Sequence, residues 1–348
     1  MSSFATEQRR VWIRWALGVV VGVVVIALLI ARRGELAGMS SRIATISVPL
    51  AALAILAEGA SLLSYALAQR RVLAVGKRLS LGGLFALTIA NDAIALSVPG
   101  EPAVSSVYRY RYYRRHGVDS AVAGWAILTL MIAQAVAMSL VILIGIVVAL
   151  TTSAHVPGLA ATFALLVIVL GVGALLMRRN AMIRLLETLL RVLRRLTGRP
   201  RGDLSARVDR LFAEMYAVHL SRRGYVTVVS WAASVWLLDA LCLIASFAAV
   251  GAVVPWRGVI LAYGLAQVLA VLPITPGGLG LVEGGLAVVL VAYGAPTVST
   301  VAAVLVYRLV AYWLAIVVGW STVGIFAARG RPKEERSADG RASESEPR

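Results

Sequence analysis

A carboxylate and a guanidinium lie within strongly apolar sequence in the last third of the chain. Glu283 belongs to VLPITPGGLGLVEGGLAVVL (271–290), and Arg308 follows 25 positions later in VYRLVAYW (306–313), beside Tyr307 and Tyr312. An unpaired arginine at the centre of a bilayer costs at least about 2.5–3.5 kcal/mol on insertion scales. We therefore pair Glu283 with Arg308. Three interpretations stay open: part of a substrate pathway, an ion pair that only locks two helices together, or a site where Arg308 binds a lipid phosphate and Glu283 orients it.

Four other carboxylates accompany this pair. Glu58 in LAILAEGASLLSY and Asp239 in VWLLDALCLI are each a proton or cation site or the partner of an arginine on a neighbouring helix. Asp92 and Glu101 lie on either side of Pro99-Gly100, and Glu101 is equally suited to capping a helix or to solvation. The predicted substrate pathway has eight residues: Glu283, Arg308, Asp239, Glu58, Asp92, Glu101, Tyr307 and Tyr312.

Motifs for catalysis, metals or cofactors are missing from the sequence. There is no G-x-S-x-G or H-E-x-x-H, the three histidines are scattered, and Cys242 is the only cysteine. The glycines of P-G-G-L-G (276–280) lack both the Lys-Ser/Thr of a P-loop and a preceding strand. We expect no enzymatic activity, no cofactor and no metal.

The composition predicts the solvent around these residues. Apolar residues make up 60% of the 348, and the mean hydropathy is +0.85. Apolar runs of about 20 residues are long enough to cross a bilayer as helices, and they are continuous rather than alternating, which excludes a β-barrel. The chain is therefore an all-α polytopic membrane protein.

The net charge of +17 is typical of a nucleic-acid-binding protein only in a soluble chain. In a membrane protein, lysine and arginine gather in cytoplasmic loops and face anionic headgroups. The same choice applies to YRYRYYRR (108–115), which is suited to stacking on single-stranded nucleic acid, to anchoring at the interface or to attracting headgroups. We expect membrane lipids as partners and no nucleic acid.

Six full spans are predicted, within a single transmembrane domain of residues 1–327. A basic amphipathic segment at 178–223 is expected on the cytoplasmic surface, and the charged, serine-rich tail, 328–348, is expected to be cytoplasmic and disordered. The spans cover about 11–31, 43–68, 120–150, 156–177, 225–250 and 297–326.

Two further apolar regions, 80–117 and 258–293, are broken near their middle and are predicted to form hairpins. The breaks are Pro99 and Gly100 in the first, and Pro273, Pro276, Gly277, Gly278 and Gly280 in the second. Pro99-Gly100 aligns with Pro276-Gly277 at an offset of 177 residues, and a long span follows each region. Broken backbone is tolerated in a membrane only where protein buries it or water fills a cavity.

The charges suggest how the hairpins lie. If each is re-entrant, the first opens to the cytoplasm and the second to the outside, and 29 of the 34 Lys and Arg residues lie on the cytoplasmic side with both termini. Such an inverted-topology repeat is typical of transporters with a site at the midplane. If the arms cross instead, the chain has eight or more spans; this alternative stays open.

The sequence also resembles a known family. PGGLGLVEGG followed by AAVLVYRLVAYW, together with SVPGEPAVSSVYRYRYYRRHG, is similar to the lysylphosphatidylglycerol synthase transmembrane-region family, also called the flippase-like domain family. The resemblance implies re-entrant hairpins and a role in moving or presenting lipids. Relatives often have Arg close after the Gly-Glu pair, whereas here Pro102 follows Glu101 and the next Arg is Arg109. About 20 residues follow the last span, so we expect no aminoacyl-lipid synthesis.

We therefore predict a lipid flippase or scramblase without its own ATPase, for an anionic phospholipid or a polyprenyl-phosphate-linked lipid. The alternatives are a non-transporting partner of a cell-envelope enzyme and an intramembrane transferase acting on a lipid-linked sugar. A separate envelope-lipid biosynthetic enzyme is a candidate partner. The composition suits a bacterium, which places the protein in the inner membrane; the oligomeric state is open.

Overall fold

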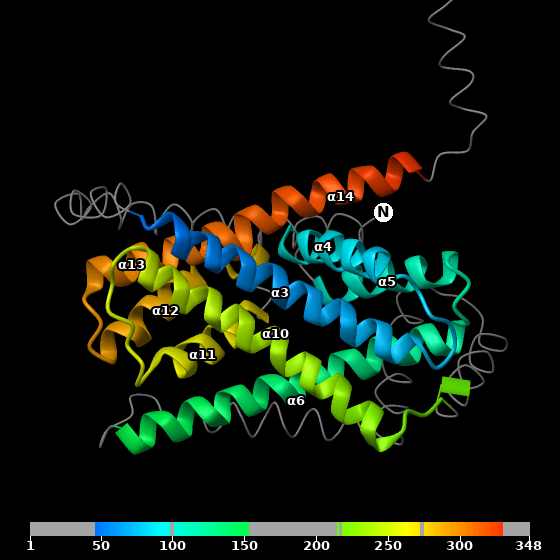
Figure 1. Cartoon of the computed structure of the whole chain (residues 1–348), viewed down its shortest axis with the longest axis horizontal. Helices are drawn as coiled ribbons and strands as arrows, with labels where there is room; N and C mark the ends of the chain where they lie inside the picture. Colours follow the sequence, from blue (N-terminus) through cyan, green and yellow to red (C-terminus); the bar gives the residue numbers. More distant parts are fainter. Residues whose placement is uncertain (1–45, 98–100, 153–213, 216–217, 272–274, 330–348) are drawn as a thin grey trace, which may run out of the picture.

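A computed structural model describes residues 46–97, 101–152, 214–215, 218–271 and 275–329, and this part of the chain is helical, without strands (Figure 1). The predicted spans at 11–31 and 156–177, most of segment 178–223 and the tail beyond residue 329 lie outside these residues. The break residues Pro99, Gly100 and Pro273 also lie outside them.

Four long apolar helices in the described part have the length and composition of membrane spans. They are α3 (Val48–Leu73), α6 (Ser120–Thr152), α10 (Arg222–Ala249) and the continuous helix of α13 (Thr297–Arg308), η2 (Leu309–Leu314) and α14 (Ala315–Arg329). At 1.5 Å per residue, the 26 residues of α3 extend about 39 Å, more than the roughly 30 Å of a hydrocarbon core. The chain is a multi-pass membrane protein.

The span predicted at 43–68 lies further along the chain than expected. α3 begins at Val48, with Pro49 in its first turn, where the missing N–H costs nothing. It then continues to Leu73, past Arg70 and Arg71, whose positive charges suit a helix C-terminus.

Each broken region forms two short helices that pack against each other. The first pair is α4 (Leu81–Ser97) and α5 (Glu101–Arg115), and the second is α11 (Val259–Val271) and α12 (Leu281–Ala292), with the 3-10 turn η1 (Pro276–Gly278) between them. Helices of 12 to 17 residues extend only about 18–26 Å, less than a hydrocarbon core.

The long helices α3 and α10 run side by side in opposite directions (Figure 1). The N–H of Ser47, just before α3, donates to the carbonyl of Ala249 at the end of α10, at 2.9 Å. Ser61 donates to the carbonyl of Val235 at 3.0 Å, and small residues such as Ala54 and Ala57 are buried along this contact. Small side chains allow the two backbones to approach closely.

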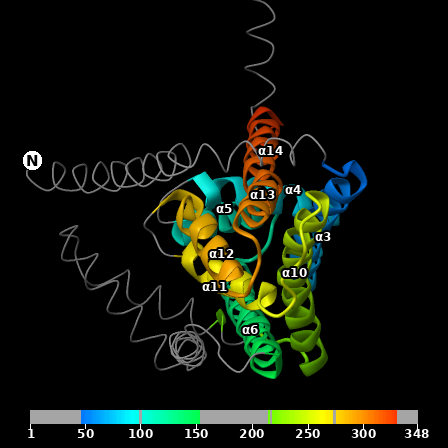
Figure 2. The ribbon, with the colours of Figure 1, turned by 90° about the vertical axis from the view of Figure 1, so that its left-hand side faces the viewer.

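The two helix pairs open at opposite ends of this bundle. Gly83 at the start of α4 lies against the Tyr112 hydroxyl near the end of α5, and Lys77, which follows α3, lies against Gly117. At the other end, Gly258 before α11 lies against Tyr293 after α12. Viewed along the bundle, α3 and α10 lie on one side and α11 and α12 on the other (Figure 2).

The helix order also recurs along the chain, long, short, short and long. Ser120 and Thr297, the first residues of α6 and α13, are 177 positions apart, which is the offset of the two Pro-Gly breaks. The first residues of α4 and α11, Leu81 and Val259, are 178 positions apart.

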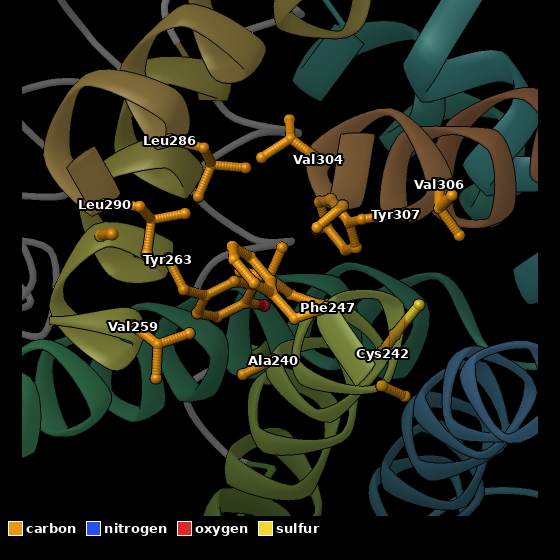
Figure 3. Packing of buried hydrophobic residues seen from close by; sticks show 14 of the residues in the cluster. Ala240, Cys242, Phe247, Val259, Tyr263, Leu286, Leu290, Val304, Val306 and Tyr307 are labelled. Carbon is orange, nitrogen blue, oxygen red and sulfur yellow. The ribbon is translucent and has the colours of Figure 1, made fainter. Parts of the chain in front are cut away.

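A buried cluster joins α10 to α13 (Figure 3). Phe247 of α10, Tyr263 of α11 and Leu286 of α12 are among its least exposed side chains, and Tyr307 of α13 is only 3% exposed. The helices that carry Asp239, Glu283 and Arg308 are thereby held together by apolar packing, which fixes the position of these charged groups.

Candidate functional site

The ion pair between Glu283 and Arg308 lies at the break of the second helix pair. Nε of Arg308 donates to Oε1 of Glu283 at 2.6 Å, and Nη2 donates to the carbonyl oxygen of Gly277 at 3.0 Å. The side chain of Arg308 is 8% exposed and that of Glu283 is 20% exposed. The structure thus brings together the two residues that the sequence analysis paired.

Glycines shape the backbone that receives Arg308. Gly277, Gly278 and Gly280 have φ angles of 56°, 67° and 82°, in the region where residues with a Cβ are strained. This turn aims the Gly277 carbonyl at Arg308 and starts α12 at Leu281. Oε2 of Glu283 then accepts the backbone N–H of Gly280, the N-cap residue, at 2.6 Å. Glu283 therefore satisfies a helix N-terminus and orients Arg308 with the same carboxylate.

The guanidinium of Arg308 keeps unused hydrogen-bonding capacity. An arginine has five N–H donors. One bond to Glu283 and one to Gly277 leave three N–H groups that meet no acceptor in the described part of the chain. The ring of Tyr312 lies 4.3 Å from the guanidinium carbon and covers one of its faces. Arg308 is therefore a fixed, largely buried cation with three N–H groups that bind no acceptor among the described residues.

The same tyrosine connects the two helix pairs. Its hydroxyl donates to the carbonyl of Leu96, near the end of α4, at 3.2 Å. Trp320 of α14 donates to the hydroxyl of the next residue, Ser97, at 3.0 Å. The end of α4 and η1 thus meet at Arg308 and Tyr312, in the interior of the bundle.

Arg308 is also the last residue before η2, a π-helical turn in the middle of the long C-terminal helix. Such turns are rare and occur mostly at functional sites. The sequence analysis predicted an uninterrupted span here and missed the π turn, for which VYRLVAYW carries no recognised signal.

A second polar group is centred on Asp239. Its Oδ2 accepts hydrogen bonds from the Tyr263 hydroxyl and from Nε2 of Gln267, both at 2.7 Å. Glu58 of α3 and Tyr307 of α13 lie close enough to interact with the same carboxyl group. The sequence analysis missed Tyr263 and Gln267; two polar residues four positions apart on one face of an apolar helix were the available signal.

The two remaining pathway carboxylates lie on the first helix pair. Asp92 of α4 is close enough to Glu58 for their charges to interact. Glu101 is the first residue of α5, and only its backbone position is described. The structure therefore connects Glu58, Asp92, Asp239 and Tyr307, and separately Glu283, Arg308 and Tyr312. Among the described residues no cluster of His, Cys, Asp or Glu is suited to a metal ion.

Comparison with known proteins identifies the family of the chain. Residues 15–319 match the family described as the lysylphosphatidylglycerol synthase TM region. A comparison with curated proteins finds no matching relative. The family match covers both helix pairs and all eight residues of the predicted pathway. The chain therefore belongs to the lysylphosphatidylglycerol synthase transmembrane-region family, which links it to lipid metabolism or flipping.

Proposed function

We propose that this protein moves an anionic lipid across the cell membrane, as a flippase or scramblase without an ATPase of its own. The observation that carries the proposal is the buried guanidinium of Arg308, three of whose N–H donors have no acceptor among the residues that the structure describes. The substrate class is a phospholipid or a polyprenyl-phosphate-linked lipid. Their shared chemistry is a phosphate, whose oxygens match the planar donor fork of arginine.

The placement of Arg308 supports transport rather than static binding. We propose that α4–α5 and α11–α12 are re-entrant hairpins of an inverted-topology repeat, because each helix is shorter than the hydrocarbon core and the pairs open at opposite ends of the bundle. Their meeting point is then near the midplane. The broken backbone at 276–280 supplies polar groups there, and such backbone is tolerated only beside protein or water.

Positive charge supports an orientation in the cell membrane. Arg70, Arg71, Arg114 and Arg115 lie at the end of the bundle where the first pair opens. Cytoplasmic loops carry the excess of lysine and arginine, so this end faces the cytoplasm, with both termini on that side. A headgroup enters from either face, binds Arg308 and leaves on the other side without any covalent step. The protein works beside a separate enzyme that makes its lipid.

Reconstitution into liposomes tests the proposal. Vesicles contain fluorescent phosphatidylglycerol or a fluorescent polyprenyl phosphate, and a membrane-impermeant quencher reports the lipid in the outer leaflet over time. Wild-type protein is expected to equilibrate at least one of these lipids faster than empty vesicles, and Arg308→Ala is expected to lose most of this effect. Arg257→Ala is the matched control, because Arg257 is exposed in a loop.

Two results would contradict the proposal. Equilibration no faster than in empty vesicles for both lipids would favour a non-transporting partner of an envelope enzyme. Equal rates for wild type and Arg308→Ala would remove Arg308 from the pathway. Transfer of a radiolabelled sugar from a lipid carrier, dependent on a carboxylate, would instead indicate an intramembrane transferase.

A further inference from the structure

Glu58 and Asp239 face each other across the contact between α3 and α10. Their carboxyl groups lie within hydrogen-bonding reach of each other. The close approach of these two helices, over small residues such as Ala54 and Ala57, makes this contact available. Arg308 does not hydrogen-bond to either carboxyl group, because among the described residues its guanidinium donates to Glu283 and Gly277 alone.

The two carboxyl groups lack a hydrogen-bond donor between them among the described residues. Oδ2 of Asp239 already accepts from Tyr263 and Gln267. Its Oδ1 and Oε2 of Glu58 are fully buried atoms that no donor in the described residues reaches. Two ionised carboxylates have no hydrogen to place between them, and burying such a pair costs several kcal/mol per ion. A single proton between the two carboxyl groups supplies the hydrogen bond that two carboxylates cannot form.

The surrounding groups favour one position for this proton. Asp239 accepts hydrogen bonds from Tyr263 and Gln267, and it also interacts with the Tyr307 hydroxyl and with the positive charge of Arg308. These contacts stabilise a negative charge on Asp239. Glu58 faces the negative charge of Asp92 and, within the described part of the chain, no cation. Cys242, the remaining ionisable group nearby, is a buried thiol.

We propose that Glu58 and Asp239 form a proton-binding site in which Glu58 carries the proton and donates a hydrogen bond to the Asp239 carboxylate. Uptake of one proton converts the Glu58 carboxylate to the acid, and no other bond forms or breaks. Tyr307 interacts with Asp239, its hydroxyl lies 3.4 Å from Nε2 of Gln267, and it directly precedes Arg308 in α13, so it connects this site to the proposed phosphate site. In this part the inference rests on the proposed function: the proton is the coupling ion for lipid movement.

Infrared spectroscopy of the protein in lipid nanodiscs tests the proton site without any transport assay. At neutral pH, wild type is expected to show a protonated-carboxyl C=O band that shifts in D₂O. Glu58→Gln is expected to remove the band, and Asp239→Asn to move it, because the acid then meets a neutral amide. Glu214→Gln, at an exposed position, is the matched control and keeps the band.

If a variant fails to fold, the wild-type spectrum alone still tests whether a protonated carboxyl group is present at neutral pH. No protonated-carboxyl band at neutral pH would overturn the proposal. A band that appears only after Na⁺ is removed would assign the site to a metal cation instead. A band that Glu58→Gln leaves unchanged would place the proton elsewhere.

A pH gradient across the liposomes tests the coupling. The gradient is expected to bias the direction of lipid movement by wild type and not by Glu58→Gln. Movement that ignores the gradient overturns the coupling while the proposed function stands. Absence of any lipid movement overturns the proposed function and the coupling together, and the infrared band still decides the proton site.

Discussion

At the scale of single residues, Glu283 has two tasks that depend on each other. One carboxylate oxygen accepts the N–H of Gly280 and the other accepts Nε of Arg308. The helix N-terminus positions the carboxylate, and the carboxylate positions the guanidinium. Loss of either partner therefore leaves the other largely buried and unpaired, whereas loss of both removes two charges from the bundle.

The mutual dependence of Glu283 and Arg308 predicts energetic coupling between them in a double-mutant cycle. Arg308→Leu is expected to lower the free energy of unfolding by about 3 kcal/mol, the lower end of the range for buried pairs, since Glu283 retains 20% exposure. Glu283→Leu/Arg308→Leu is expected to cost less than the sum of the single changes, by about 0.5–3 kcal/mol. Unfolding in mixed micelles with increasing denaturing detergent measures these values. Additive single effects would contradict the coupling.

A second prediction concerns the backbone under Arg308. In Gly277→Ala, the new Cβ lies 2.3 Å from Cε2 of Tyr312 and 3.0 Å from the carbonyl oxygen of Leu96, at a φ of 56°. We expect the left-handed backbone alone to lower the free energy of unfolding by at least about 1–2 kcal/mol. Gly284→Ala is the control: this exposed helical glycine has no atom within 4 Å of the added Cβ, and alanine should stabilise it by about 0.5–1 kcal/mol. Equal unfolding temperatures for both variants would refute the argument.

The sequence predicted some of these residue contacts and not others. The Glu283–Arg308 contact was predictable because an isolated charge in an apolar span needs a partner, and few candidates lie nearby in the chain. The contact between Tyr312 and Leu96 was not, because these residues are 216 positions apart and one group is a backbone carbonyl. No side-chain pattern identifies a carbonyl acceptor in advance.

At the scale of helices, proline and glycine explain why the breaks were predictable. Proline removes a backbone donor and glycine allows positive φ, so Pro276 and Gly277 end a helical pattern wherever the chain places them. The packing of the helices depends on three-dimensional contacts instead. Gly319 of α14 is buried against Ala93 of α4, and nothing in the sequence around Gly319 indicates which helix it meets.

The contact of α14 with α4 leads to a prediction at this scale. In Gly319→Ala, the added Cβ lies 2.3 Å from Cβ of Ala93 and 2.6 Å from the carbonyl oxygen of Ile89, so the two helices must separate. We expect the free energy of unfolding to fall by about 1–3 kcal/mol, as it does for overpacked cores. Gly324→Ala, five residues further along α14, adds its Cβ to open space and should be neutral or stabilising. Thermal unfolding of both variants in the same detergent decides; a stable Gly319→Ala protein would show that α14 does not pack on α4.

At the scale of the whole molecule, two helix pairs enter from opposite ends and meet in the interior. If Arg308 binds a lipid phosphate, as we propose, this arrangement places it where each end of the bundle can reach it in turn, as alternating access requires. The repeat offset predicted from the sequence that each of two similar broken regions is followed by a long helix, since the offset depends only on order along the chain. The re-entrant, inverted arrangement is our proposal. Composition left re-entrant hairpins and full crossings open, because short apolar helices satisfy both.

The last prediction tests, by labelling single cysteines in a Cys242→Ala background, whether the two helix pairs open to opposite faces of the membrane. His116 follows α5 at the end where the first pair opens, and Thr297 begins α13 at the end where the second pair opens; both are exposed. A membrane-impermeant maleimide is expected to label Thr297→Cys on intact cells and His116→Cys only in inside-out vesicles. Wild-type protein, which retains Cys242, should remain unlabelled in both preparations because this side chain is fully buried. If both new cysteines react from the same face, the two pairs do not open to opposite sides, and the midplane site for the lipid phosphate is lost with that arrangement.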